Sequence, residues 1–177
     1  MRTVTFGVAN SLDNFIARTD HSVDWLRWDD EVAAVTADFW ATIDTVVMGR
    51  KTYDVAVGSG TASYPGVRNI VFSRTLSQAP APEVEVLATD AAAAVAGLKQ
   101  QEGKGICVMG GGELARALFE ADLIDEIGLN THPILLGAGV PLFLPMHRPV
   151  ELELVESRPL RNGCLLTRYT VRHRGAR

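Results

Sequence analysis

The sequence predicts an α/β protein of three layers, in which helices cover both faces of a mostly parallel β-sheet. Short apolar runs typical of strands alternate with helix-like segments through most of the chain. Two alternating runs flank Asn162–Gly163, and Asn-Gly between such runs is the strongest short-range hairpin signal. No repeat or linker divides the chain, so we expect a single domain over residues 1–177. Strands joined through helices pair in parallel, and the closing hairpin predicts an antiparallel C-terminal edge.

The predicted strands are short runs rich in apolar and β-branched residues. Thr45–Gly49 and Arg68–Ser73 are largely apolar, which is typical of strands buried on both faces of a sheet. Several others alternate between apolar and polar residues, as half-buried strands do. In chain order, strands are predicted over 3–10, 45–49, 68–73, 83–89, 105–109, 126–133, 150–160 and 164–172. Residues 11–25 and 134–145 lack a helical or strand period and are expected to form loops.

The predicted helices lie between these strands. In residues 29–44, apolar residues recur at helical spacing behind acidic residues, which indicates an amphipathic helix. These residues are Val32, Val35, Phe39 and Ile43. The Ala-rich segment 90–102 starts at Asp90, a favourable N-cap residue. Another helix is expected to start at Arg50. A last one is expected over residues 112–121, directly after a run of glycines.

Bulk composition excludes several classes of function. The net charge of -4 gives no electrostatic basis for nucleic acid or an anionic membrane as the main partner. Basic residues gather only in the C-terminal RHRGAR, which we expect to be a solvated tail. The scattered histidines and the distant Cys107 and Cys164 predict no metal site, and both thiols are expected to be free and buried. The first residues lack the apolar core of a signal peptide, and no apolar run approaches the roughly 20 residues of a membrane span, so we expect a cytoplasmic protein.

A run of glycines marks the first candidate site. Gly110, Gly112 and Ala115 satisfy the G-x-G-x-x-A pattern of dinucleotide-binding folds. That pattern belongs on the first strand–helix turn, with an acidic residue at the end of the next strand, and neither condition holds here. Two interpretations remain: a phosphate cradle at a helix N-terminus, or a tight turn between a strand and a helix.

Two further strand ends favour the phosphate cradle. Gly49 ends one strand and is followed by Arg50, Lys51 and Thr52, so cations and a hydroxyl stand at a helix start. Another strand ends at Ser73–Arg74, again a hydroxyl beside a guanidinium. The carboxyl ends of parallel strands converge on the crevice where such sheets bind ligands. A ligand with several phosphates, such as NADPH, would use all three strand ends.

These motifs, taken in order, resemble the dihydrofolate reductase family, and most closely the branch that contains the reductase domain of riboflavin biosynthesis. The matching pieces are VANSLDNFIA, VVMGRKTYD, NIVFSRT, ICVMGGGELARALFEADLIDEI and THPILLGAGVPLF, which together cover about residues 3 to 145. The resemblance implies a dihydrofolate reductase-like fold with a central sheet of about eight strands. It also implies NADPH as cofactor and, because the family often dimerises, a homodimer.

The resemblance also assigns cofactor contacts. Ser73 and Arg74 would lie near the 2′-phosphate, Ala9 and Ile16 beside the nicotinamide, and the SLDNFIAR loop over it as a lid. The family usually has Gly where Asn14 stands, and Asn tolerates positive φ. The full set of implied cofactor residues is Ala9, Ile16, Gly49, Arg50, Lys51, Thr52, Ser73, Arg74, Gly111, Gly112, Glu113 and Leu114.

The substrate side is defined less sharply. Dihydrofolate reductases carry an acid on the first helix, whereas the matching turn here holds only Ala33, Ala34 and Val35. Asp24 is a candidate general acid or orienting group. Aromatic residues could sandwich a flat heterocycle, or they could be core residues. The candidates are Trp25, Phe39, Trp40 and Tyr53.

Three functions follow from these observations. The first is an NADPH-dependent reductase of a small planar heterocycle, either pterin-like or resembling a pyrimidine precursor of riboflavin. The second is a true dihydrofolate reductase, which the missing helix acid argues against. The third is a protein that binds a nucleotide on this fold without catalysis.

Overall fold

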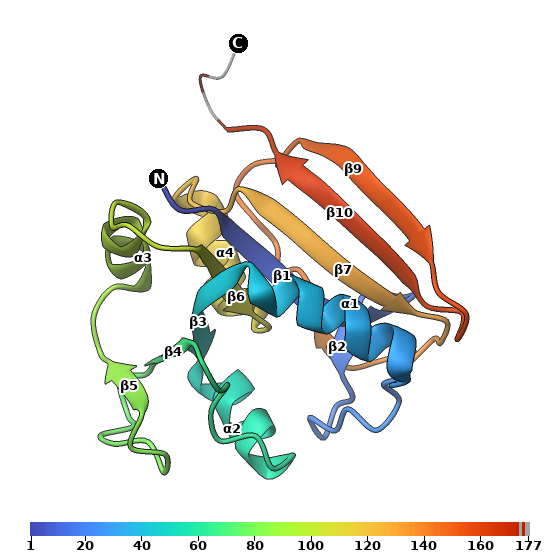
Figure 1. Ribbon diagram of the computed structural model, residues 1–177, viewed down its shortest axis with the longest axis horizontal. Helices are drawn as coiled ribbons and strands as arrows, with labels where there is room; N and C mark the ends of the chain where they lie inside the picture. The colour runs from blue at the N-terminus through green and yellow to red at the C-terminus, as the bar shows by residue number, and fades with distance from the viewer. Residues whose placement is uncertain (174, 176–177) are drawn as a thin grey trace.

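The computed structural model describes residues 1–173 and 175 and shows one eight-stranded sheet, in the order β5-β4-β3-β6-β1-β7-β10-β9 (Figure 1). Its strands are β1 (Val4–Ser11), β3 (Ile43–Gly49), β4 (Arg68–Phe72), β5 (Val84–Leu87), β6 (Gly105–Met109), β7 (Glu126–His132), β9 (Leu152–Pro159) and β10 (Leu165–Val171). Pairs from β5 to β7 are parallel, and β10 pairs antiparallel with β7 and β9. The predicted mostly parallel sheet with an antiparallel C-terminal edge is confirmed.

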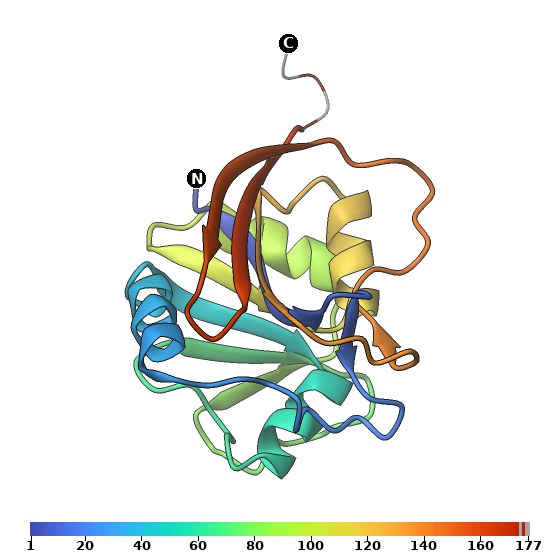
Figure 2. The same ribbon diagram turned by 90° about the vertical axis from the view of Figure 1, so that its right-hand side faces the viewer.

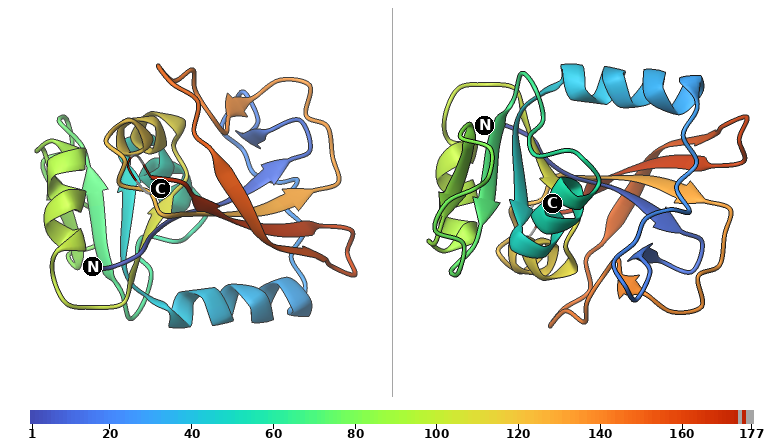
Figure 3. Two further views of the ribbon diagram at one scale, coloured as in Figure 1. Left: turned by 90° about the horizontal axis from the view of Figure 1, so that it is seen from above. Right: turned by 90° about the horizontal axis from the view of Figure 1, so that it is seen from below.

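Helices cover both faces of this sheet, as Figure 3 shows for α1 and α4, and they are α1 (Asp30–Ala41), α2 (Arg50–Gly58), α3 (Ala91–Lys99) and α4 (Gly112–Glu120). The core on one face contains residues of α3 and α4, such as Val95 and Leu118, packed with Phe6 of β1. On the opposite face, Phe39 of α1 and Tyr53 of α2 pack with Val46 and its neighbours. Alternate side chains of each central strand therefore pack against the helices on opposite faces of the sheet.

Aspartate side chains cap the starts of α1 and α3. The Asp29 carboxylate accepts a hydrogen bond from the Val32 N–H at the start of α1. Asp90 does the same for the Ala93 N–H at the start of α3, so the predicted N-cap is confirmed. These bonds satisfy donors that a helix N-terminus otherwise leaves free.

A small second sheet lies in the two segments that were expected to be loops. Strands β2 (Phe15–Ala17) and β8 (Val140–Pro141) pair antiparallel and lie side by side in Figure 2. Gly139 permits the approach, because a Cβ there would lie 2.2 Å from the Ala17 carbonyl oxygen. The loop expectation was wrong here because strands this short carry no readable period.

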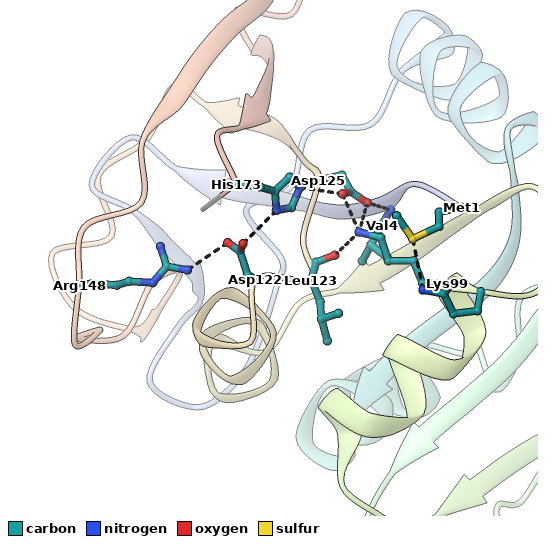
Figure 4. Close-up of polar contacts among 9 residues, drawn as sticks. Met1, Val4, Lys99, Asp122, Leu123, Asp125, Arg148 and His173 are labelled. Carbon is teal, nitrogen blue, oxygen red and sulfur yellow. Dashed lines mark hydrogen bonds and ion pairs between the residues drawn. The ribbon is translucent and has the colours of Figure 1, made fainter. Parts of the chain in front are cut away.

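The C-terminal end is anchored through His173 rather than fully solvated. Its Nε2 atom lies 2.8 Å from Oδ1 of Asp125. The Asp125 carboxylate also accepts hydrogen bonds from the Val4 N–H and the Lys99 ammonium (Figure 4). The network joins β1, α3 and the start of β7 to the end of β10. In the same predicted tail, Arg172 Nη2 lies 3.6 Å from Oε2 of Glu153, and Arg174 and Arg177 lie outside the described residues.

Two global expectations can be compared with the fold. Both Cys107 and Cys164 are buried free thiols, as predicted. Among residues 1–173 and 175, no helix combines the length and apolarity needed to cross a bilayer.

Candidate active site

A cavity of about 2050 Å³ opens where β1, β3, β4 and β6 end. It is lined by the residues that follow these strands and continues across the α1 face of the sheet to β7, β9 and β10. A crevice at the carboxyl ends of parallel strands is the usual ligand site of such a sheet. Every residue that the sequence assigned to the cofactor lines this cavity.

The glycine run forms a turn that brings bare backbone to the cavity. Gly110 and Gly111 have φ of 51° and 74°, values that L side chains rarely adopt. A Cβ on Gly111 would lie 3.1 Å from Thr52 Oγ1, so the start of α2 and the turn before α4 are in close approach. The glycines are therefore required for the turn, whichever ligand binds.

Two helix N-termini face the same space without side-chain caps. The N-cap residue of α2 is Gly49 and that of α4 is Gly111, and neither position provides a capping side chain. Free backbone N–H groups and the helix dipole favour an anion at both starts. The open glycine turn and these uncapped starts fit the phosphates of a dinucleotide.

The cations at the cavity differ in how far they are already paired. Arg50 Nε lies 2.7 Å from Oδ1 of Asp54, and Lys51 Nζ lies 3.7 Å from Oε1 of Glu113. Arg74 is exposed and has no ion-pair partner among the described residues. The adjacent Ser73 hydroxyl accepts hydrogen bonds from the N–H groups of the next turn and fixes its path. Arg74 is therefore the cation most available to a ligand phosphate.

The lid segment is held in place by a side-chain network. Asn14 has φ of 62°, as its position in place of the family's glycine implied. The Asp13 carboxylate accepts a hydrogen bond from the Ser11 hydroxyl and from the N–H groups of Leu136 and Gly137. These bonds tie the turn before β2 to the segment before β8. Ala9 and Ile16, which flank this turn, both line the cavity.

The four aromatic candidates separate into two pairs. Phe39 and Trp40 line the cavity, and the Trp40 ring stacks on Tyr64 with centroids 5.1 Å apart. Trp25 and Tyr53 do not line it and are buried. Trp25 packs its ring edge-on against His132, and Tyr53 belongs to the core beneath α1 and α2. For Trp25 and Tyr53, the structure favours the core interpretation.

Asp24 does not meet the geometric requirement for a general acid. Its carboxylate is exposed, accepts a hydrogen bond from Arg18 Nε at 2.7 Å and does not line the cavity. Other residues of the same loop line the cavity instead, among them Val23, Leu26 and Trp28. The sequence shows only that an acid stands in a loop, not which way it points.

Several cavity residues could not be selected from the sequence. Trp28 lines the cavity and is 68% exposed, which is unusual for so large an apolar side chain. Asn130 lies beside Ala9 in the register of β1 and β7, and its Oδ1 atom is buried without a hydrogen-bond partner among the described residues. Arg168 reaches the same space from β10. For Asn130 and Arg168 the only sequence signal is strand alternation, which gives the face of the sheet but not its function, and Trp28 lies in a loop without a period.

The thiol and imidazole groups near the cavity are held in their neutral forms by burial. Cys107 lines its floor, but burial raises the pKa of the thiol to about 12, so it is not a thiolate nucleophile. His132 Nδ1 accepts a hydrogen bond from the Arg27 N–H and lies 3.4 Å from Cys164 Sγ. Burial lowers the His132 pKa and raises that of Cys164, so both are held neutral. The described residues contain no cluster of potential metal ligands.

Comparison with known proteins identifies a family and relatives of similar fold. The model of the RibD C-terminal domain family matches residues 2–166. The uncharacterised protein YwjB of Bacillus subtilis is 36% identical over 155 residues, which cover 86% of this chain and 88% of YwjB. A solved structure of a proposed riboflavin biosynthesis protein from Shewanella sp. PV-4 superposes with a TM-score of 0.83 at 27% identity, covering 98% of this chain and 100% of the other.

A bifunctional enzyme shares the fold at lower identity. The Thermotoga maritima diaminohydroxyphosphoribosylaminopyrimidine deaminase/5-amino-6-(5-phosphoribosylamino)uracil reductase superposes with a TM-score of 0.71 at 16% identity. The match covers 97% of this chain and 57% of that protein. At this identity the likeness concerns the fold alone.

Proposed function

This chain belongs to the RibD C-terminal domain family, and on that basis we propose that it is an NADPH-dependent reductase of a small planar heterocycle, pterin-like or pyrimidine-like. The observation that carries the proposal is the convergence of two uncapped helix N-termini, a positive-φ glycine turn and Arg74 on one cavity. The same cavity continues to an aromatic-lined region under α1.

The cofactor would be held mainly through its phosphates. The backbone N–H groups at Gly111–Leu114 would contact the pyrophosphate, and those at the start of α2 would add a second positive dipole end. Arg74 and Ser73 would distinguish NADPH from NADH by the 2′-phosphate. When bound, NADPH supplies a hydride from the nicotinamide ring.

The chain's own residues would position the reactants and exclude water. Ala9 offers a flat, uncharged surface at the end of β1, and Ile16 on β2 narrows the cavity beside it. Phe39 and Trp28 provide apolar area on the α1 side. Hydride transfer needs little more than this placement in a dry site. No carboxylate stands at Ala33–Val35, which disfavours folate as the substrate.

The proposal is tested by following NADPH oxidation while pterins and aminopyrimidines are added in turn. Turnover of at least one compound, with dihydrofolate at background, is the expected result. NADPH binding without oxidation by any compound in the panel would favour the non-catalytic protein on the same fold. Rapid turnover of dihydrofolate would instead favour a true dihydrofolate reductase.

We also propose that two copies of this chain associate through the C-terminal hairpin. Strand β9 is an edge of the sheet, and its Leu152 and Leu154 are exposed. They lie opposite Val171 and Tyr169, which pack toward the α3–α4 core. Both leucines therefore lie on the face away from the cavity, where an apolar patch is free to bind a second copy.

A further inference from the structure

The part of the cavity under α1 has a floor of very small side chains. Gly7 of β1 and Gly128 of β7 are register partners, and both line the cavity. A Cβ on Gly128 would meet nothing within 4 Å, whereas one on Gly7 would lie 3.4 Å from the Phe39 ring. The floor is therefore open beside the Phe39 ring, which leaves space for a flat group between the sheet and α1.

The arginines that reach this part are already paired with carboxylates. Arg168 Nη1 lies 3.6 Å from Glu126 Oε1, and its Nε lies 3.6 Å from Glu156 Oε2. Arg158 Nη2 lies 3.3 Å from an oxygen of Glu31. The charge of each guanidinium is therefore already partly neutralised before a ligand binds.

The two parts of the cavity consequently differ in the sign of their charge. Under α1, the lining carboxylates outnumber the arginines Arg158 and Arg168. These carboxylates are Asp38, Glu126 and Glu156. Around the helix starts the balance is reversed. There the lining cations are Arg50, Lys51 and Arg74, and the lining acids are Asp90 and Glu113.

A phosphate placed under α1 would therefore meet excess negative charge and no unpaired arginine. Like charges brought together in a partly enclosed site cost free energy, and this cost provides selectivity against the charged ligand. Amino groups on a heterocycle would meet the same carboxylates favourably.

We propose that the part of the cavity under α1 selects a planar heterocycle without a phosphate group, and that Glu126 and Glu156 set this selectivity. The proposal rests on the proposed reductase function and specifies its substrate class. It separates this chain from the Thermotoga enzyme of the same fold, whose name specifies a phosphoribosyl substrate. Glu126 and Glu156 act through Arg168, by pairing with its guanidinium and neutralising its charge.

The test compares 5-amino-6-(5-phosphoribosylamino)uracil with the same compound after phosphatase treatment. Both are titrated calorimetrically into protein saturated with NADP⁺, so that binding is measured without turnover. The unphosphorylated compound is expected to bind tighter by on the order of tenfold, which corresponds to about 1.4 kcal/mol. Equal or tighter binding of the phosphorylated compound, or binding of neither, overturns the proposal.

Charge-neutral variants identify the residues responsible. Glu126→Gln and Glu156→Gln should each reduce the preference several-fold by releasing Arg168. Glu153→Gln is the matched control, since Glu153 is on the same strand as Glu156, is similarly exposed and pairs with Arg172 outside the cavity. An equal reduction in the control contradicts the assignment. Failure of the reductase proposal is recognised separately, because NADPH would then either not bind or not be oxidised by any compound of the panel.

Discussion

Oγ1 of Thr52 lies 3.1 Å from the point that a Cβ on Gly111 would occupy, so the starts of α2 and α4 meet over bare backbone. Gly111→Ala should therefore lose NADPH affinity by tenfold or more, because the methyl group fills the approach to the uncapped N–H groups. It should also destabilise the fold by about 1–2 kcal/mol through its positive φ. Calorimetric titration and thermal melting measure the two effects.

Gly137→Ala provides the control for backbone strain. Gly137 has the same φ of 74° as Gly111, but a Cβ there would meet nothing within 4 Å. It lies outside the cavity lining. The control should lose comparable stability and keep its NADPH affinity. A similar loss of affinity in both variants would show that the turn acts only through folding.

Trp28 is expected to contact the heterocycle. It lines the cavity with 68% of its surface exposed, so a flat ligand can cover its indole ring. Trp28→Ala should weaken heterocycle binding by on the order of tenfold, as aromatic contacts are worth about 0.5–1.5 kcal/mol beyond burial. NADPH binding should be unchanged, and Trp28→Phe should recover part of the loss.

Leu135→Ala is the control for Trp28, because Leu135 is also 68% exposed but does not line the cavity. It should leave both affinities unchanged. Unaltered heterocycle binding in Trp28→Ala would remove Trp28 from the site.

His132 should make the fold sensitive to mild acid. Burial, with repulsion from Arg27, lowers the pKa of His132 below its ordinary value of 6.5. The unfolded chain therefore binds a proton near that value, and the folded chain only at lower pH. Keeping His132 neutral therefore costs the folded state nothing above pH 6.5, and the free energy of unfolding decreases as the pH falls below that value.

The variant His132→Asn isolates this effect. Asn offers an oxygen that can accept the Arg27 N–H bond but does not titrate. Melting temperatures measured from neutral pH to about pH 5.5 should fall more steeply for the wild type than for the variant. Parallel curves would show that His132 does not couple folding to pH.

Association of two copies through the β9–β10 hairpin should depend on the exposed leucines of β9. Leu154 is 56% exposed on the edge strand β9, and a charge there would be buried by a second copy. Leu154→Lys should therefore convert a dimer to a monomer in light scattering. Leu12→Lys, at a similarly exposed leucine after β1, should remain dimeric. A monomeric wild type at micromolar concentration contradicts this proposal.

The sequence predicted elements whose cause is local. The N-cap Asp90, the Asn-Gly hairpin and the glycine turn depend on neighbouring residues, and each lies where the pattern placed it. Most of the residues expected to bind the cofactor stand at strand ends, and parallel pairing brings such ends together.

The substrate side depends on tertiary contacts that no local pattern specifies. Trp25 and Trp28 are three residues apart in the same aperiodic loop, yet Trp25 packs on His132 and Trp28 faces the cavity. Tyr53 follows directly after the cationic helix start but points into the core. Which of these rings meets a ligand is determined by the path of the loop and the position of α1.

The most direct test of the reductase assignment is the titration of NADPH and NADH into the wild type and Arg74→Ala. NADPH should bind with a Kd on the order of micromolar and NADH more weakly. Arg74→Ala should lose about tenfold for NADPH alone, since a charge-assisted contact is worth about 1.5–3 kcal/mol. Arg116→Ala, at an exposed arginine of α4 outside the cavity, should change neither affinity. Binding of neither nucleotide below roughly millimolar concentration would contradict the assignment.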